Sequence, residues 1–175
     1  MGVPLMDLSG QWEPLRERLL AAVGEVIASG VFILGPNVRA FEEETAADLG
    51  VAHAIGVANG TDALVLVLDA MGIGPGDEVI CPAFTFYATA ESIARIGATP
   101  VFADIDADTM NLDVADVARR ITAKTKAIMP VHLFGRPAPL AELAALGLPV
   151  IEDSAQAFGS PDIRSEEHTS ELQSH

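Results

Sequence analysis

The chain has 175 residues, half of them hydrophobic, which is enough to bury one core of ordinary size and excludes disorder throughout. Ten basic against 25 acidic residues give a net charge of -15, which would repel a nucleic-acid backbone and excludes nucleic acid as a partner. No signal-like segment opens the chain, and no apolar run approaches the roughly 18 residues that a membrane span needs. The single cysteine, Cys81, lies in an apolar run and is interpreted as a small core residue. These features predict a soluble, cytoplasmic protein that contacts no membrane.

Two amphipathic helices are predicted in the N-terminal part. From about residue 12 to 28, leucine and valine recur at helical spacing between charged residues, and Ser29-Gly30 supplies a stop. A second helix is predicted over residues 36–49, ending at Gly50.

Beyond residue 51, short apolar runs alternate with helical stretches. The runs predict strands over 52–58, 78–81, 100–103, 127–131 and 150–151. Helices are predicted over 61–71, 87–96, 114–121 and 140–146. This alternation predicts an α/β fold, a three-layer α/β/α arrangement around a mostly parallel sheet. No domain boundary is apparent before residue 160.

The last twelve residues, 164–175 (RSEEHTSELQSH), break this pattern, with no apolar periodicity and no strand signal. The string resembles a sequencing-library adapter translated in frame. We therefore expect it to be an artefactual, unstructured tail that is not part of the fold.

In open α/β sheets, ligands bind at the carboxyl ends of the strands, so the residues that follow each strand are the candidates for chemistry. The first run is followed by Asn59-Gly60-Thr61-Asp62, which opens a helix and points free N–H groups and the positive end of the helix dipole at an anion such as phosphate. The alternative is that Asn59 or Thr61 is a plain N-cap.

Two further strand ends carry candidate residues. Phe84 and Phe86 follow the second run, where flat rings could stack on a flat cofactor or could instead pack into the core. Asp153 follows the last run, and a carboxylate there is costly unless a cation or several donors pair with it. The alternative for Asp153 is an N-cap. His132 is a weaker candidate, since a lone histidine is more often structural.

Several segments together resemble the DegT/DnrJ-type nucleotide-sugar aminotransferases, a family with the pyridoxal-phosphate fold type I. The resemblance runs from about residue 26 to 157. Its motifs are SGVFILGP (29–36), ANGTDAL (58–64), GDEVI (76–80), TFYAT (85–89), PVHLFG (130–135) and EDSAQ (152–156). Their order along the chain makes the resemblance specific.

The resemblance implies a site for pyridoxal 5'-phosphate. Gly60 and Thr61 would hold the phosphate, and Phe86 would stack on the pyridine ring. Asp153 would face the ring nitrogen and keep it protonated, while Gln156 would approach the ring hydroxyl. Phe32, in the segment that the resemblance places near the pocket, would lie close to the substrate.

The implied reaction moves an amino group from an amino acid, usually glutamate, to a keto-sugar carried on a nucleotide, in a homodimer. It needs a lysine that forms a Schiff base with the cofactor. Lys124 and Lys126 precede a strand and so lie at the wrong end of the sheet. Residues 1–163 are therefore expected to be the truncated N-terminal part of the cofactor-binding large domain, inactive alone and prone to aggregate through an uncovered sheet edge.

Two alternatives stay open. The chain could be a non-catalytic, cofactor-binding or regulatory module of the same fold. It could also belong to relatives that use the same cofactor for sugar dehydration.

Overall fold

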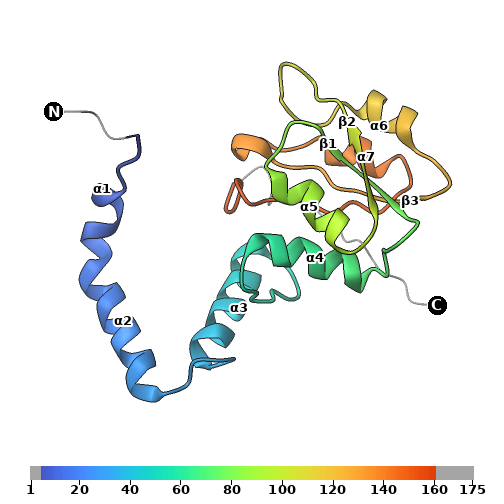
Figure 1. Ribbon diagram of the computed structural model, residues 1–175. Helices are drawn as coiled ribbons and strands as arrows, with labels where there is room; N and C mark the ends of the chain where they lie inside the picture. Colours follow the sequence, from blue (N-terminus) through green and yellow to red (C-terminus); the bar gives the residue numbers. More distant parts are fainter. Residues whose placement is uncertain (1–4, 161–175) are drawn as a thin grey trace. The chain divides into compact units, whose positions relative to one another are not determined.

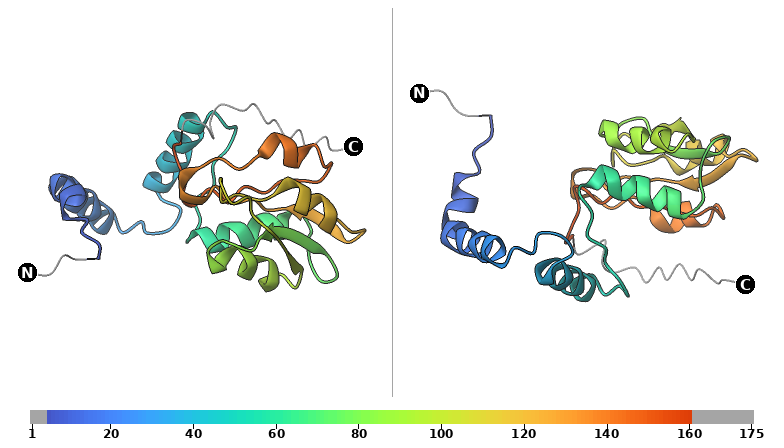
Figure 2. Two further views of the ribbon diagram at one scale, coloured as in Figure 1. Left: turned by 90° about the horizontal axis from the view of Figure 1, so that it is seen from above. Right: turned by 60° about the horizontal axis from the view of Figure 1, so that its bottom comes forward.

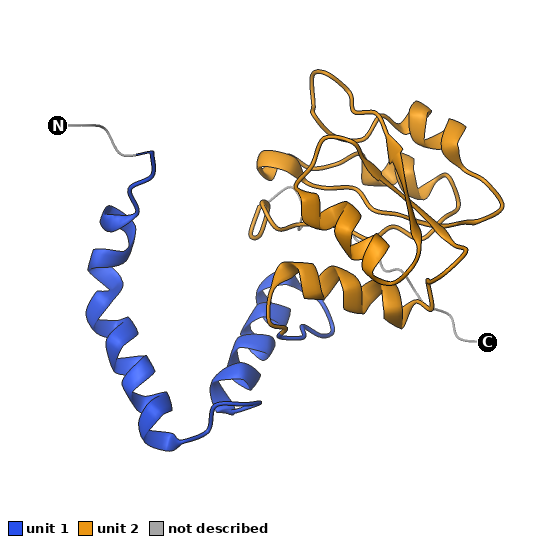
Figure 3. Cartoon of the chain, in the orientation of Figure 1, with its two compact units in different colours: residues 1–56 blue, residues 57–175 orange. Residues whose placement is uncertain are grey.

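The computed structural model describes residues 5–160, and the chain divides into two compact units, residues 1–56 and 57–175 (Figure 3). The sequence showed no boundary before residue 160, so a division after residue 56 differs from that expectation. Burial explains the difference, because the described helices of the first unit bury no residue, whereas those of the second unit pack around a sheet. The expected tail, residues 164–175, lies outside the described residues.

The first unit contains the helical segments α1 (Ser9–Trp12), η1 (Glu13–Leu15), α2 (Arg16–Ser29) and α3 (Pro36–Leu49), shown in Figure 1. Both long helices end as predicted, at Gly30 and Gly50. These glycines have φ of 68° and 69°, the left-handed conformation that closes a helix and that other residues rarely adopt.

The second unit contains a parallel sheet in the order β2-β1-β3. Its strands are β1 (Glu78–Pro82), β2 (Thr99–Ala103) and β3 (Thr125–Ile128). Its helices are α4 (Gly60–Ala70), α5 (Tyr87–Arg95), α6 (Val114–Arg120), η2 (Leu133–Gly135) and α7 (Leu140–Ala144). Within residues 5–160, no helix is long and apolar enough to cross a membrane.

Two of the five predicted strands are corrected by the structure. Residues 52–58 form no strand: nearly all of them are exposed, and no neighbouring strand in the described chain supplies the backbone partners that a strand requires. Residues 150–151 do not form a full strand either. The chain there touches the sheet through isolated parallel bridges, Ile128 with Val150 and Val131 with Asp153. That contact still brings residue 153 beside the end of β3.

The sheet separates two layers of helices, as Figures 1 and 2 show for the second unit. Successive side chains of β1 point to opposite faces. Val79 and Cys81 pack in one core cluster with residues of α4 and α5, whereas Ile80 packs in a second cluster with residues of α6 and α7. The three-layer α/β fold is therefore confirmed. Cys81 is a core residue as predicted, and burial raises the pKa of its thiol to about 12.

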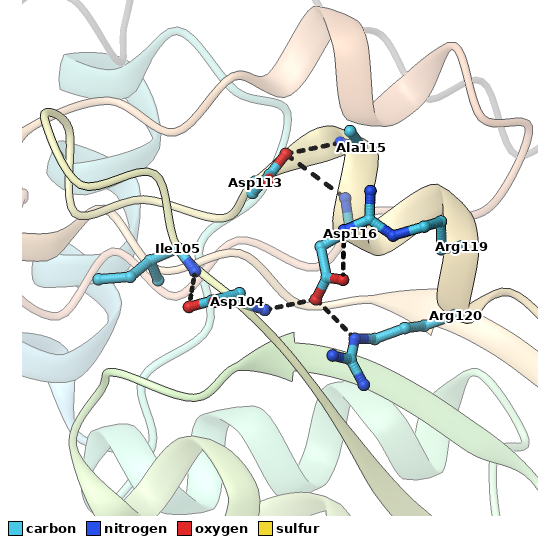
Figure 4. Close-up of polar contacts among 7 residues, drawn as sticks. All are labelled: Asp104, Ile105, Asp113, Ala115, Asp116, Arg119 and Arg120. Carbon is cyan, nitrogen blue, oxygen red and sulfur yellow. Dashed lines mark hydrogen bonds and ion pairs between the residues drawn. The ribbon is translucent and has the colours of Figure 1, made fainter.

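A carboxylate network fixes α6 against the end of β2 (Figure 4). Asp116 accepts a hydrogen bond from the Arg120 side chain at 2.6 Å, from the backbone N–H of Asp104 at 2.7 Å and from Arg119 at 2.8 Å. The bond from Arg120, followed by that from the Asp104 backbone, lowers the pKa of Asp116 from 3.8 to about 2. The ionised carboxylate therefore stabilises the folded chain.

Replacing Asp116 with asparagine should lower the urea midpoint of unfolding at neutral pH, because the charged acceptor is lost. A carboxyl group whose pKa is depressed on folding stabilises the protein above its unfolded pKa, and that stability is lost as the pH falls through the folded pKa. The difference in urea midpoint between the unsubstituted chain and Asp116→Asn should thus be constant above pH 3.8 and shrink toward pH 2. An equal gap at every pH would show that the charge of Asp116 is not what stabilises this contact.

Candidate functional site

A cavity of about 230 Å³ opens in the second unit where the chain leaves the carboxyl ends of the strands. Its walls come from the start of α4, the connection from β1 to α5, the segment after β3 and the residues after Val150. The lining residues are Gly60, Thr61, Leu64, Thr85, Phe86, Ala88, Val131, Leu133, Asp153, Ala155 and Gln156. All five residues expected to hold the cofactor therefore line one cavity.

The N-terminus of α4 presents free backbone donors to this cavity. Asn59 caps the helix, its side-chain oxygen accepting the N–H of Asp62 at 2.9 Å, so the N-cap alternative is correct for Asn59. In the described chain, the N–H groups of Gly60 and Thr61 donate to no protein acceptor. Free amides and the positive end of an eleven-residue helix attract an anion.

Phe86 lies at the N-terminus of α5 with 73% of its surface exposed. The alternative that this ring packs into the core is therefore wrong. Phe84 is also exposed, and its ring meets that of Phe134 edge to face with centroids 6.5 Å apart. The connection that follows β1 thus offers an open aromatic face beside the cavity.

Asp153 is 9% exposed, and each oxygen of its carboxylate accepts one hydrogen bond. Oδ1 accepts the N–H of Ala155 at 3.2 Å, and Oδ2 accepts the hydroxyl of Thr89 at 3.1 Å. The N-cap alternative is therefore only partly right, since Oδ1 caps a turn and no helix follows it in the described residues. No ion pair reaches Asp153 within residues 5–160, so a cationic ligand would find it uncompensated.

His132 has a structural arrangement. Its ring is fully buried, and Nδ1 accepts the N–H of Ala138 at 3.0 Å. The proton of the neutral ring is therefore on Nε2, which donates to Glu152 at 2.9 Å. The backbone N–H of His132 also donates to the carbonyl of Asp153 at 3.1 Å. His132 ties the end of β3 to the segment that carries Asp153.

Gln156 lines the cavity with its amide orientation fixed. Its Oε1 accepts the backbone N–H of Phe134 at 2.7 Å, so the amide nitrogen is the free end. In the described chain this nitrogen donates to no acceptor, which leaves it available for an oxygen of a ligand.

The two lysines lie at the opposite end of the sheet from the cavity. Lys124 immediately precedes β3, and Lys126 within β3 places Nζ 3.9 Å from Asp77, which precedes β1. Asp153 follows the carboxyl end of the same sheet. The described residues that line the cavity include no lysine.

Phe32, the residue expected near the substrate, belongs to the first unit and is 66% exposed. Its ring is free to contact a ligand or another chain. Its role stays a prediction.

The sequence reasoning missed the hydroxyl pair Thr85 and Thr89. Their oxygens lie 3.0 Å apart, and Thr89 also reaches Asp153. The only signal in the sequence was that the two threonines are four residues apart. That spacing indicates a shared role only once α5, which carries Thr89, is known to face Asp153.

The chain resembles curated proteins over most of its length. It is 52% identical over 164 residues to a "Pleiotropic regulatory protein" of Geobacillus stearothermophilus, covering 91% of this chain and 44% of the relative. It is 50% identical over 162 residues to a UDP-N-acetyl-3-dehydro-alpha-D-glucosamine 3-aminotransferase of Acidithiobacillus ferrooxidans, covering 90% and 44%. The chain thus spans less than half the length of these relatives.

Solved structures agree with the fold described above. DesV of S. venezuelae, crystallised with a ketimine intermediate, superposes with a TM-score of 0.86 at 45% identity, covering 90% of this chain and 43% of DesV. NtdA of Bacillus subtilis, solved with bound cofactor PMP, superposes with a TM-score of 0.79 at 36% identity, covering 82% and 34%. A sequence model of one family also matches residues 14–165, so nearly the whole chain is accounted for, and the chain belongs to the DegT/DnrJ/EryC1/StrS aminotransferase family.

Proposed function

We propose that this chain supplies the cofactor-holding wall of a pyridoxal-phosphate-dependent aminotransferase. The enzyme transfers an amino group from an amino acid, glutamate, to a keto-sugar linked to a nucleotide. One observation carries the proposal: the free amides of Gly60 and Thr61 and the uncompensated carboxylate of Asp153 line the same cavity.

The donor set fits this cofactor. A phosphate suits the N-terminus of α4, and a protonated ring nitrogen suits a buried carboxylate with no cationic partner in the described chain. An exposed phenyl face at Phe86 suits stacking on a flat ring, and the free amide nitrogen of Gln156 suits a ring oxygen. The 230 Å³ cavity is smaller than the roughly 300 Å³ of a complete ligand pocket, as expected of a site with further walls.

When bound, pyridoxal phosphate supplies the carbonyl group that exchanges the amino group and a ring that accepts electrons. The chain's residues orient that ring. Gly60 and Thr61 would hold its phosphate by backbone N–H donation, and Asp153 would keep the ring nitrogen protonated. Phe86 would fix the ring plane and exclude water from one face.

The substrate class rests on the relatives. The Acidithiobacillus protein is named for a keto-derivative of a UDP-linked amino sugar, and the family as a whole is one of aminotransferases. We extend this chemistry to the whole protein to which the chain corresponds, with Phe32 near the sugar. We also propose that the whole protein is a homodimer, for which the exposed apolar side chains of α2 offer a contact face.

A second candidate function is a regulatory module that binds the cofactor without turnover. The Geobacillus relative, 52% identical, carries a regulatory name.

A chimera separates the two candidates. The matched segment of this chain should replace the corresponding segment of the Acidithiobacillus relative, whose remaining half supplies the rest of the enzyme. We expect the purified chimera to aminate the relative's keto-sugar within about tenfold of the parent rate, measured by coupled formation of the keto-acid product.

The matched control is the same chimera carrying Asp153→Asn, which should bind the sugar and lose turnover. A folded chimera that binds the cofactor yet turns over no faster than this control would reject the aminotransferase proposal and favour the regulatory candidate.

A further inference from the structure

A pair of threonine hydroxyls, one buried and one partly buried, lies against the Asp153 carboxylate. Thr89, on the first turn of α5, is fully buried and places its hydroxyl 3.1 Å from Oδ2 of Asp153. The Thr85 hydroxyl lies 3.0 Å from that of Thr89 and itself lines the cavity. The Thr85 hydroxyl, the Thr89 hydroxyl and the Asp153 carboxylate thus form a continuous series of hydrogen bonds that begins at the cavity wall.

The number of protons available determines which way these hydrogen bonds run. An ionised carboxylate can only accept, so the single hydroxyl proton of Thr89 points to Asp153. The oxygen of Thr89 is then the acceptor for Thr85, whose proton points to Thr89. Two hydroxyl dipoles are thereby aligned toward one negative charge, and each strengthens the other.

The pair also determines how the carboxylate is turned. Only two hydrogen bonds reach it in the described chain, the Ala155 N–H on Oδ1 and the Thr89 hydroxyl on Oδ2. With Thr89 absent, the Oδ1 bond alone would remain, and the carboxylate could rotate about its last side-chain bond. A carboxylate that meets one ring nitrogen needs a fixed direction.

We infer that Thr89, supported by Thr85, is a positioning residue that aims the Asp153 carboxylate at the ring nitrogen of the cofactor, which rests on the function proposed above. Thr89 touches neither cofactor nor substrate in this arrangement. It acts through Asp153.

The test uses the chain itself and pyridoxamine phosphate, a cofactor form that needs no lysine for binding. Thr89→Val keeps the shape and removes the donor. It should weaken binding about tenfold and lower the pH at which the ring nitrogen of bound, ¹⁵N-labelled pyridoxamine phosphate loses its proton by about one pH unit. Thr89→Ser restores the hydroxyl and should return both values to those of the unsubstituted chain. Thr85→Val should give a smaller loss, about threefold.

Ser92→Ala is the matched control. Ser92 is a buried hydroxyl on the same helix that donates to the carbonyl of Thr89 and does not contact Asp153. It should leave affinity and the ring-nitrogen titration unchanged. If Thr89→Val binds as the unsubstituted chain does while Asp153→Asn loses binding, the inference fails and the proposed function stands. If Asp153→Asn also binds normally, or the unsubstituted chain binds no pyridoxamine phosphate, the proposed function fails and the inference with it.

Discussion

Asp153→Asn should weaken the binding of pyridoxamine phosphate to this chain by about a thousandfold. A carboxylate and a protonated ring nitrogen about 4 Å apart attract each other by about 4 kcal/mol at an effective dielectric near 20. Each 1.4 kcal/mol or so corresponds to a tenfold change in affinity. The side chain is buried and has no cationic partner in the described residues, so its neutralisation breaks no internal ion pair. Calorimetric titration at neutral pH measures the change.

Asp69→Asn is the control for this substitution. It removes the same charge from the exposed last turn of α4, at the other end of the helix from Gly60. Its affinity should equal that of the unsubstituted chain. If the two variants bind equally well, overall charge and not the position of Asp153 determines binding.

Leu68→Ala should destabilise the second unit by about 2–5 kcal/mol, the usual cost of a cavity left by a buried leucine. Leu68 is fully buried on α4, in the core cluster that also contains Val79, Ile93 and Met129. Urea unfolding followed by circular dichroism would measure the change. Because the Gly60 and Thr61 amides that we propose hold the phosphate lie on the same helix, pyridoxamine phosphate should protect this variant less than the parent chain.

Leu66→Ala, two positions away on the same helix, provides the comparison. Leu66 is 52% exposed, and its truncation should cost less than about 1 kcal/mol. Equal effects from both leucines would mean that α4 does not pack on the sheet as described.

Local signals in the sequence predicted the helices better than the strands. Gly30 and Gly50 stop helices through their own backbone freedom, which is visible in sequence. A strand depends on a partner elsewhere in the chain, and no local pattern shows whether that partner exists. Residues 52–58 have a strand-like composition and no partner among the described residues, so the prediction of a strand there was wrong.

The residues of the candidate site were predicted better than the strands that were expected to carry them. Gly60 and Asp153 were expected at one cofactor site, each after a predicted strand, and both line the cavity although residues 52–58 form no strand. Thr89 could not be assigned in the same way. Its contact with Asp153 depends on the rotation of α5 about its own axis, which is set by the packing of that helix and not by the order of the strands.

The hydroxyl of Thr89 and the carboxylate that accepts it are 64 positions apart in the chain. Such distant pairings close late in folding, because a long loop must lose its entropy before the contact forms. A partly folded chain would hold the amide end of α4 without its opposing carboxylate. Only the folded chain, with the α4 amides and the Asp153 carboxylate both in place, could bind the phosphate and the ring nitrogen of one cofactor molecule. A ligand at a hundred times its dissociation constant would then favour that arrangement by about 2.7 kcal/mol, so vitamin B6 supplied during expression would act as a folding aid.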